Sequence, residues 1–161
     1  MFLDVAYVAS ASNVADRASR KVQRNTYTLP SWFVHWLHAK FTIAAHMFAP
    51  AVQPLAPVFA TLDDSLGSCG NPWFQAWTHP VGKVFIFPPL RDAMLFLAVA
   101  CITAHARGDV LLLLPRWTSK NYYQEAAGHA TRMWTFGLNC HHAAYPTQHL
   151  PVKRSFTLFQ I

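Results

Sequence analysis

Charge is what this sequence has least of. Asp, Glu, Lys and Arg make up 12% of its 161 residues, about half the share usual in a soluble domain. We therefore expect a surface that a partner, or more of the same polypeptide, normally covers. Acids are the scarcer sign, with 7 Asp and Glu against 13 Lys and Arg, and the formal net charge is +6. This balance is compatible with binding to nucleic-acid phosphates and equally with an ordinary basic domain.

Cysteine is also scarce. Cys69, Cys101 and Cys140 form an odd, widely spaced set, which excludes a disulfide framework and favours a reducing compartment. The N-terminus lacks the basic start of a signal peptide, and Asp4 interrupts its apolar run. We predict an intracellular protein of the cytoplasm or nucleus.

Long apolar runs and common nucleotide-binding motifs are missing. The uncharged stretch from Met94 to Ala104 is about half of what a membrane-spanning helix needs, so no membrane partner is expected. There is no G-x-G-x-x-G loop, no P-loop and no G-x-S-x-G elbow, which excludes the commonest dinucleotide, nucleoside-triphosphate and hydrolase signatures.

The stretch from Val84 to Leu114 is the most ordered part of the pattern. Two apolar runs, stopped by Pro88-Pro89 and by Pro115, enclose a segment of helix length that opens near Asp92 and ends near Arg107. Apolar runs without alternation suit strands covered on both faces. Strand, helix and strand of this length predict a βαβ unit, and hence an α/β fold with a mostly parallel sheet.

The remaining pattern is shorter and more broken. The loop-rich segment from Ala49 to Pro80 carries Trp73, Phe74 and Trp77. We predict strands over Phe2–Ala9, Thr42–Phe48 and Ser155–Ile161, and helices over Val14–Arg20, Ser31–Phe41 and about Asn121–Thr131.

Three clusters have the residue types of metal or acid–base sites but not the spacing. His35 and His38 have no nearby cysteine or carboxylate, and Cys140-His141-His142 is an incomplete tetrahedral set. Asp63 and Asp64 are adjacent, so their side chains diverge and a turn or helix cap suits them better. We expect no zinc at the first two.

The residues from Tyr7 to Arg20 read Y-V-A-S-A-S-N-V-A-D-R-A-S-R. This resembles the last strand and helix of a retroelement-type RNase H domain, with Ala9 where proline is usual. The resemblance implies that Asp16 is the last of four metal-binding carboxylates. Two-metal hydrolysis needs several carboxylates for its magnesium ions, and the others would lie upstream. We therefore expect an incomplete site and assign residues 1–27 to an RNase H remnant.

A second resemblance covers roughly Leu29 to Gly137. Its pieces are F-A-T from Phe59, F-P-P-L from Phe87, G-D-V-L-L-L-L-P, and R-W-T-S-K-N-Y-Y from Arg116. They resemble the domain that follows RNase H in tyrosine-recombinase retroelements of the DIRS order, including VIPER-like elements, which is itself similar to phage-type DNA adenine methyltransferases. The resemblance implies a Rossmann-like sheet flanked by helices over residues 28–161.

The sequence departs from that family where methyl transfer takes place. The family's Asp/Asn-Pro-Pro-Tyr/Phe loop accepts a hydrogen bond from the adenine amine and stacks on the flipped base. Here the loop is Phe87, Pro88, Pro89 and Leu90, without acceptor or final ring. The glycine-rich cofactor loop is also absent, since Ala44 to Pro50 stands in its place. The fold is expected without the chemistry.

Three functions follow. The first is a catalytically inactive fragment of a retrotransposon polyprotein, whose parent would be an RNA-directed DNA polymerase with RNase H, and whose partners would be that upstream portion and nucleic acid. The second is an active adenine methyltransferase using S-adenosylmethionine; otherwise no cofactor is expected. The third is a basic module binding single strands. Its candidate contacts, whose aromatic members would otherwise be packing residues, are Arg116, Trp117, Lys120, Tyr122 and Tyr123.

Overall fold

The structure is a computed structural model that describes residues 27–63, 65–142 and 152–161. The predicted strand Phe2–Ala9, the predicted helix Val14–Arg20 and the candidate Asp16 lie outside the described residues. The proposed boundary between residues 1–27 and 28–161 therefore stays a prediction.

A single seven-stranded sheet organises the described part, in the order β1-β6-β7-β5-β4-β2-β3. Strands β3, β2, β4 and β5 pair in parallel, whereas β5–β7, β7–β6 and β6–β1 are antiparallel. The α/β class is confirmed, but the sheet is mixed rather than mostly parallel. The strands are β1 (Tyr27–Thr28), β2 (Ile43–Met47), β3 (Val58–Ala60), β4 (Lys83–Ile86), β5 (Val110–Pro115), β6 (Arg132–His142) and β7 (Val152–Gln160).

The predicted βαβ unit is present as β4, the helix α3 (Asp92–His105) and β5. Strands β4 and β5 are parallel neighbours, with Phe85 opposite Leu111 and Ile86 opposite Leu112. Every residue of β5 is buried. An uninterrupted apolar run is the pattern that a strand covered on both faces requires.

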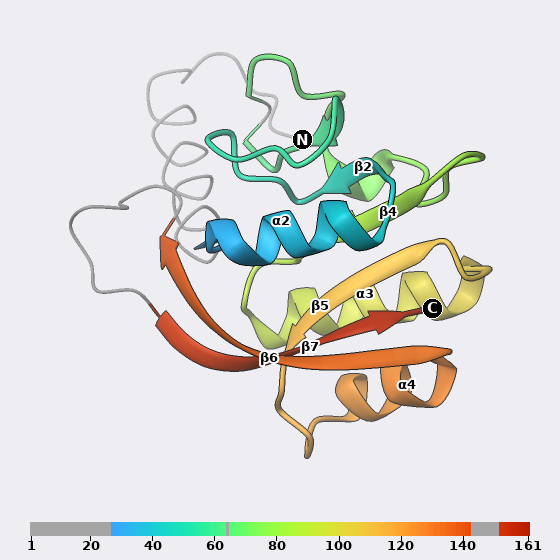
Figure 1. Ribbon diagram of the computed structural model, residues 1–161. Helices are drawn as coiled ribbons and strands as arrows, with labels where there is room; N and C mark the ends of the chain where they lie inside the picture. The colour runs from blue at the N-terminus through green and yellow to red at the C-terminus, as the bar shows by residue number, and fades with distance from the viewer. Residues whose placement is uncertain (1–26, 64, 143–151) are drawn as a thin grey trace, which may run out of the picture.

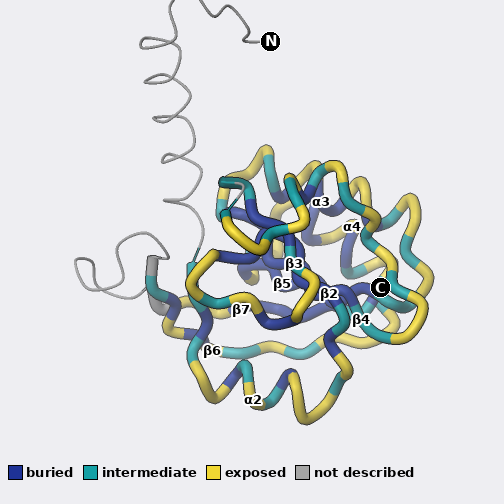
Figure 2. Tube along the Cα trace, turned by 90° about the horizontal axis from the view of Figure 1, so that it is seen from above, coloured by how far each residue is buried: buried dark blue, intermediate teal, exposed yellow. Residues whose placement is uncertain are grey.

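Helices cover both faces of the sheet (Figures 1 and 2). One face carries α2 (Ser31–Lys40), and the other carries α3 together with α4 (Asn121–His129). The two hydrophobic cores follow this division, because Leu111 and Leu113 of β5 pack with Phe33 and Leu37 of α2. Leu112 packs on the opposite side with the residues of α3 and α4. Side chains that alternate along one strand thus feed two separate cores.

Helix ends differ little from the expectation. The predicted helix after Lys120 ends at His129 rather than Thr131, because Thr131 is already hydrogen-bonded through its backbone N–H to Gln160 at the start of the β6–β7 pairing. No helix in the described ranges is long and apolar enough to cross a bilayer.

Strand β6 is the largest element that the sequence analysis did not predict. It pairs with β7 over nine positions, from Arg132 opposite Gln160 to Cys140 opposite Val152. Its rings Trp134 and Phe136 pack against Trp36 of α2 at centroid distances of 5.8 and 4.8 Å. This strand therefore completes the core under α2.

Candidate functional site

The parallel part of the sheet contains a topological switch point. From β2 the chain goes to β3 on one side and then to β4 on the other, so β2 lies between them. In open α/β sheets, ligands bind in the crevice outside the carboxyl ends of the strands at such a point. Here that position is bordered by the residues that follow Met47 of β2 and Ile86 of β4.

Phe48 occupies the position directly after β2. Its side chain is 1% exposed and packs edge-on against Trp73 and Trp77 at centroid distances of 5.0 and 5.7 Å. Its φ is 62°, and it is the non-glycine residue of the described part with a positive φ. Left-handed backbone is costly for a bulky side chain. A buried aromatic ring thus fills the position directly after β2, on a backbone that is under strain.

The loop after β4 is equally closed. Phe87, Pro88 and Pro89 are buried and Leu90 is half-buried. The Phe87 ring packs edge-on against Phe156 at 5.8 Å, in the core under α2. None of the four side chains can accept a hydrogen bond, so the loop offers no side-chain acceptor to the amine of a base.

A basic and aromatic surface follows β5 at the same edge of the sheet. Arg116 and Lys120 are exposed, and the backbone N–H of Arg116 donates to Ser155 O at 2.9 Å. That bond places the start of β7 beside the loop, where the Arg154 guanidinium lies 5.4 Å from the centre of the half-buried Trp117 ring. We call Arg116, Trp117, Lys120 and Arg154 the carboxyl-edge patch.

One carboxylate lies beside this patch. Asp92, in the first turn of α3, accepts hydrogen bonds from Tyr122 Oη at 2.8 Å and from Lys120 Nζ at 3.1 Å. These bonds, that of Tyr122 first, lower the pKa of Asp92. Burial and the neighbouring Asp92 raise the pKa of Tyr122. The acid therefore ties the start of α3 to the start of α4.

The five predicted contact residues divide into two groups. Arg116, Trp117 and Lys120 share the loop before α4. Tyr122 and Tyr123 are 5% and 6% exposed. Tyr123 bonds to Thr157 Oγ1 at 2.7 Å and packs on Phe159. Their faces are not open to bases, so the structure supports the alternative that these two are packing residues.

Metal ligands do not gather in the described ranges. They contain no group of three or more His, Cys, Asp or Glu residues able to hold an ion. Burial raises the pKa of the Cys140 thiol to about 12, which disfavours the thiolate that metal binding needs. His35 and His38 are exposed. Asp63 accepts a hydrogen bond from Ser65, and Asp64 lies outside the described residues.

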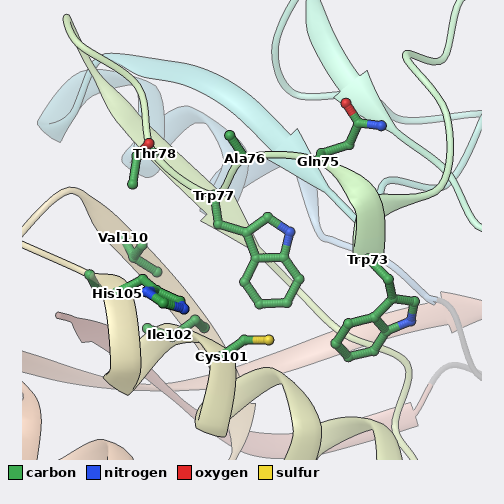
Figure 3. A pocket seen from close by; sticks show the side chains of 10 residues that line it. Trp73, Gln75, Ala76, Trp77, Thr78, Cys101, Ile102, His105 and Val110 are labelled. Atoms are coloured by element: carbon green, nitrogen blue, oxygen red, sulfur yellow. The ribbon is translucent and has the colours of Figure 1, made fainter.

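The amino ends of the strands carry two hollows. The first, about 370 Å³, lies between the segment from Trp73 to Thr78 and the end of α3 (Figure 3). The second, about 480 Å³ and open, lies at the starts of β2, β4 and β5. No site was predicted at the tryptophans from the sequence. The first is lined by Trp73, Gln75, Ala76, Trp77, Thr78, Cys101, Ile102, His105, Ala106 and Val110.

No match was found when the chain was compared with protein-family profiles and with curated proteins.

Proposed function

We propose that this chain is a catalytically inactive, methyltransferase-like part of a retroelement polyprotein that holds nucleic acid at the carboxyl-edge patch. The observation that carries the binding role is the patch itself. The loop after β5 carries two exposed cations, Arg116 and Lys120, and a third, Arg154, lies 5.4 Å from the Trp117 ring of the same loop; among the three, Lys120 is paired with a described carboxylate, Asp92.

The patch is suited to backbone contact more than to base readout. Arginine and lysine neutralise phosphates without regard to sequence. Trp117 packs on the core under α3 and α4 and has the guanidinium of Arg154 near its ring. A base that stacks on Trp117 would either displace the Arg154 guanidinium or bind next to it. Binding is therefore expected to depend steeply on salt and little on sequence.

Buried aromatic side chains fill the crevice at the switch point, which supports the proposal that the chain is catalytically inactive. Phe48 and Phe87 are 1% and 3% exposed, and both replace residues that a methyltransferase of the resembling family needs. In that family one position gives close approach to the cofactor and the other accepts the adenine amine. Phe48 is too bulky for the close approach that glycine allows, and the Phe87 ring has no atom that accepts a hydrogen bond.

The binding role is tested by the salt dependence of single-strand binding. We expect Arg116→Ala combined with Arg154→Ala to weaken binding of a single-stranded oligonucleotide. The slope of log K against log salt should become shallower by about 0.7 for each lost contact. Arg132→Ala is the matched control, because Arg132 is an exposed arginine at the opposite end of the sheet, paired with Gln160. Equal effects of the double variant and the control would exclude the patch.

The inactive state is tested separately by calorimetric titration with S-adenosylmethionine. We expect no saturable heat at micromolar concentrations, because the crevice is filled. Saturable micromolar binding that Trp77→Ala leaves unchanged would instead favour the methyltransferase alternative. The retroelement origin has its own test, since the reading frame upstream of Met1 should encode reverse transcriptase and RNase H.

A further inference from the structure

The hollow beside α3 has the form of a small-molecule pocket. Trp73 and Trp77 reach into it from one side, and Cys101, Ile102 and His105 of α3 face them from the other (Figure 3). The two indole rings are 5.5 Å apart and inclined at 39°. Its volume of about 370 Å³ lies within the range of ligand pockets, which are mainly apolar with few polar groups.

Two contacts outside the hollow fix the orientation of Trp77. Its Nε1 donates to Pro72 O at 2.7 Å, and the ring packs against Phe48. The hydrogen bond and the contact with Phe48 hold the Trp77 ring in one orientation. A flat ligand that stacks on this ring would therefore cost little side-chain conformational entropy. Thr78 and His105 are the polar groups of the lining that Figure 3 shows near this ring.

The second hollow adjoins the first along the chain and differs from it in charge. Residues of the two linings are direct sequence neighbours at Thr78–His79, Ala106–Arg107 and Asp109–Val110. The second lining contains three cations, Lys40, Lys83 and Arg107, against the single carboxylate of Asp109.

The cations of this groove are partly held by the backbone. Lys83 Nζ donates to Gly108 O at 2.7 Å, and an Arg107 guanidinium nitrogen donates to Ala106 O at 2.8 Å. The Arg107 backbone N–H bonds to Asp109 Oδ1 at 3.2 Å. Both side chains keep further N–H donors for an anion.

We propose that the two hollows together bind a mononucleotide, with the base on Trp77 and the phosphate beside Arg107 and Lys83. An aromatic hollow and a cationic one, whose linings meet at three pairs of neighbouring residues, match the two chemical halves of that ligand. The site lies at the amino ends of the strands, opposite the carboxyl-edge patch, and does not depend on it. A free mononucleotide and the 5′-terminal nucleotide of a strand have the same base and phosphate, so either could occupy the site.

Protection of Cys101 from alkylation tests the proposal. Cys69 is the other exposed thiol of the described part, and Cys140 is buried, so Cys69→Ser leaves Cys101 as the reporter. Adenosine 5′-monophosphate should slow its reaction with a maleimide roughly in proportion to site occupancy. Adenosine should protect at higher concentration only, and inorganic phosphate should not protect. The same protection measured with a 5′-phosphorylated oligoadenylate shows whether the site prefers the end of a strand or the free nucleotide.

Variants then separate the two halves by calorimetry with adenosine 5′-monophosphate. Trp77→Ala should weaken binding about tenfold or more, since base stacking is lost. Arg107→Ala should weaken binding of the nucleotide about tenfold and leave the affinity for adenosine unchanged. Cys101→Trp, at an exposed helix position, should block the hollow without disturbing the core, which circular dichroism would check. Trp117→Ala, in the carboxyl-edge patch, should have no effect.

The proposal is overturned if the nucleotide neither binds nor protects Cys101. It is equally overturned if Cys101→Trp and Arg107→Ala bind the nucleotide as the parent chain does. A failure of the carboxyl-edge patch would instead appear in the Arg116 and Arg154 variants and leave these results untouched.

Discussion

The two ends of the parallel strands differ in what fills them. At the carboxyl end, the switch point is closed by the buried rings of Phe48 and Phe87. Toward the amino end, the tryptophan hollow, whose Trp73 and Trp77 also pack on Phe48, and the basic groove remain open. Strand order thus indicates where a crevice belongs, whereas the side chains that follow β2 and β4 decide whether it can hold a ligand.

The difference has a structural cause in the connections. No helix follows β2, and the chain goes from Phe48 to β3 through a proline-containing loop whose Leu55 and Ala56 cover the α2 side. Trp73 and Trp77 then cover the α3 side. The hollow lies between this segment and α3.

The largest expected effect comes from opening the closed end at Phe48. Phe48→Ala should lower the free energy of unfolding by about 3–5 kcal/mol, because a buried ring is lost. Phe48→Gly should be no worse than Phe48→Ala, since glycine accepts a φ of 62° without steric cost. Urea denaturation of both variants measures the difference.

Phe85 is the control for this order of stabilities. It is fully buried within β4 and lacks a positive φ, so Phe85→Gly should be clearly less stable than Phe85→Ala. If the glycine variant were clearly less stable than the alanine variant at Phe48 too, the backbone strain proposed at Phe48 would be refuted.

The next effect concerns the open end, at Gly82. A Cβ there would lie 2.8 Å from Ala44 Cβ and 2.9 Å from Thr42 O, which is too close for β4 to stay paired with β2. We expect Gly82→Ala to cost about 1–3 kcal/mol and to reshape the basic groove, which Gly82 lines. Thermal unfolding gives the measurement.

Gly137 provides a matched test, because a Cβ there meets nothing within 4 Å. Gly137→Ala lies in β6 and should be neutral or slightly stabilising. Equal losses for the two variants would show that the close approach of β4 and β2 is not what Gly82 serves.

The sequence predicted the central elements because their patterns are long and bounded. Proline stops and uninterrupted apolar runs placed β4, α3 and β5 to within a few residues. Strand β6 was missed although Trp134, Phe136, Leu138 and Cys140 alternate with Thr135, Gly137 and Asn139. That period of two was a usable signal, but the end of the segment was weighed only as a metal cluster, which was rejected, and not as part of a strand. Strand β3, with three residues, is too short to give a signal.

The site was less predictable because its character depends on contacts between distant segments. The basic loop at Arg116 was found from local sequence, but Arg154 joins it only through the pairing of β7 with β5. Tyr122 and Tyr123 precede Ala126 by four and three positions, a spacing that already favours an inward face. The tryptophan hollow requires Trp77 and α3 to meet, which no local pattern encodes.

The last expected effect concerns His46 and appears as a function of pH. His46 of β2 is 1% exposed, and its Nδ1 accepts the Leu55 N–H at 3.2 Å. Its Nε2 has no hydrogen-bond partner in the part that the structure describes. Burial lowers the pKa of His46 from 6.5 to about 3. The folded state therefore keeps His46 neutral where the unfolded chain takes up a proton.

The sign follows from proton linkage. Well above pH 6.5 neither state is protonated at His46 and its contribution to stability is complete. As pH falls through 6.5 toward 3, the unfolded state binds more protons and is favoured. This should cost about 1 kcal/mol per pH unit between pH 6 and 4. His46→Gln keeps an acceptor for Leu55 N–H but cannot titrate in this range, so its stability should fall less steeply. Parallel pH profiles for the two proteins, measured by urea denaturation, would mean that the proton is taken up elsewhere.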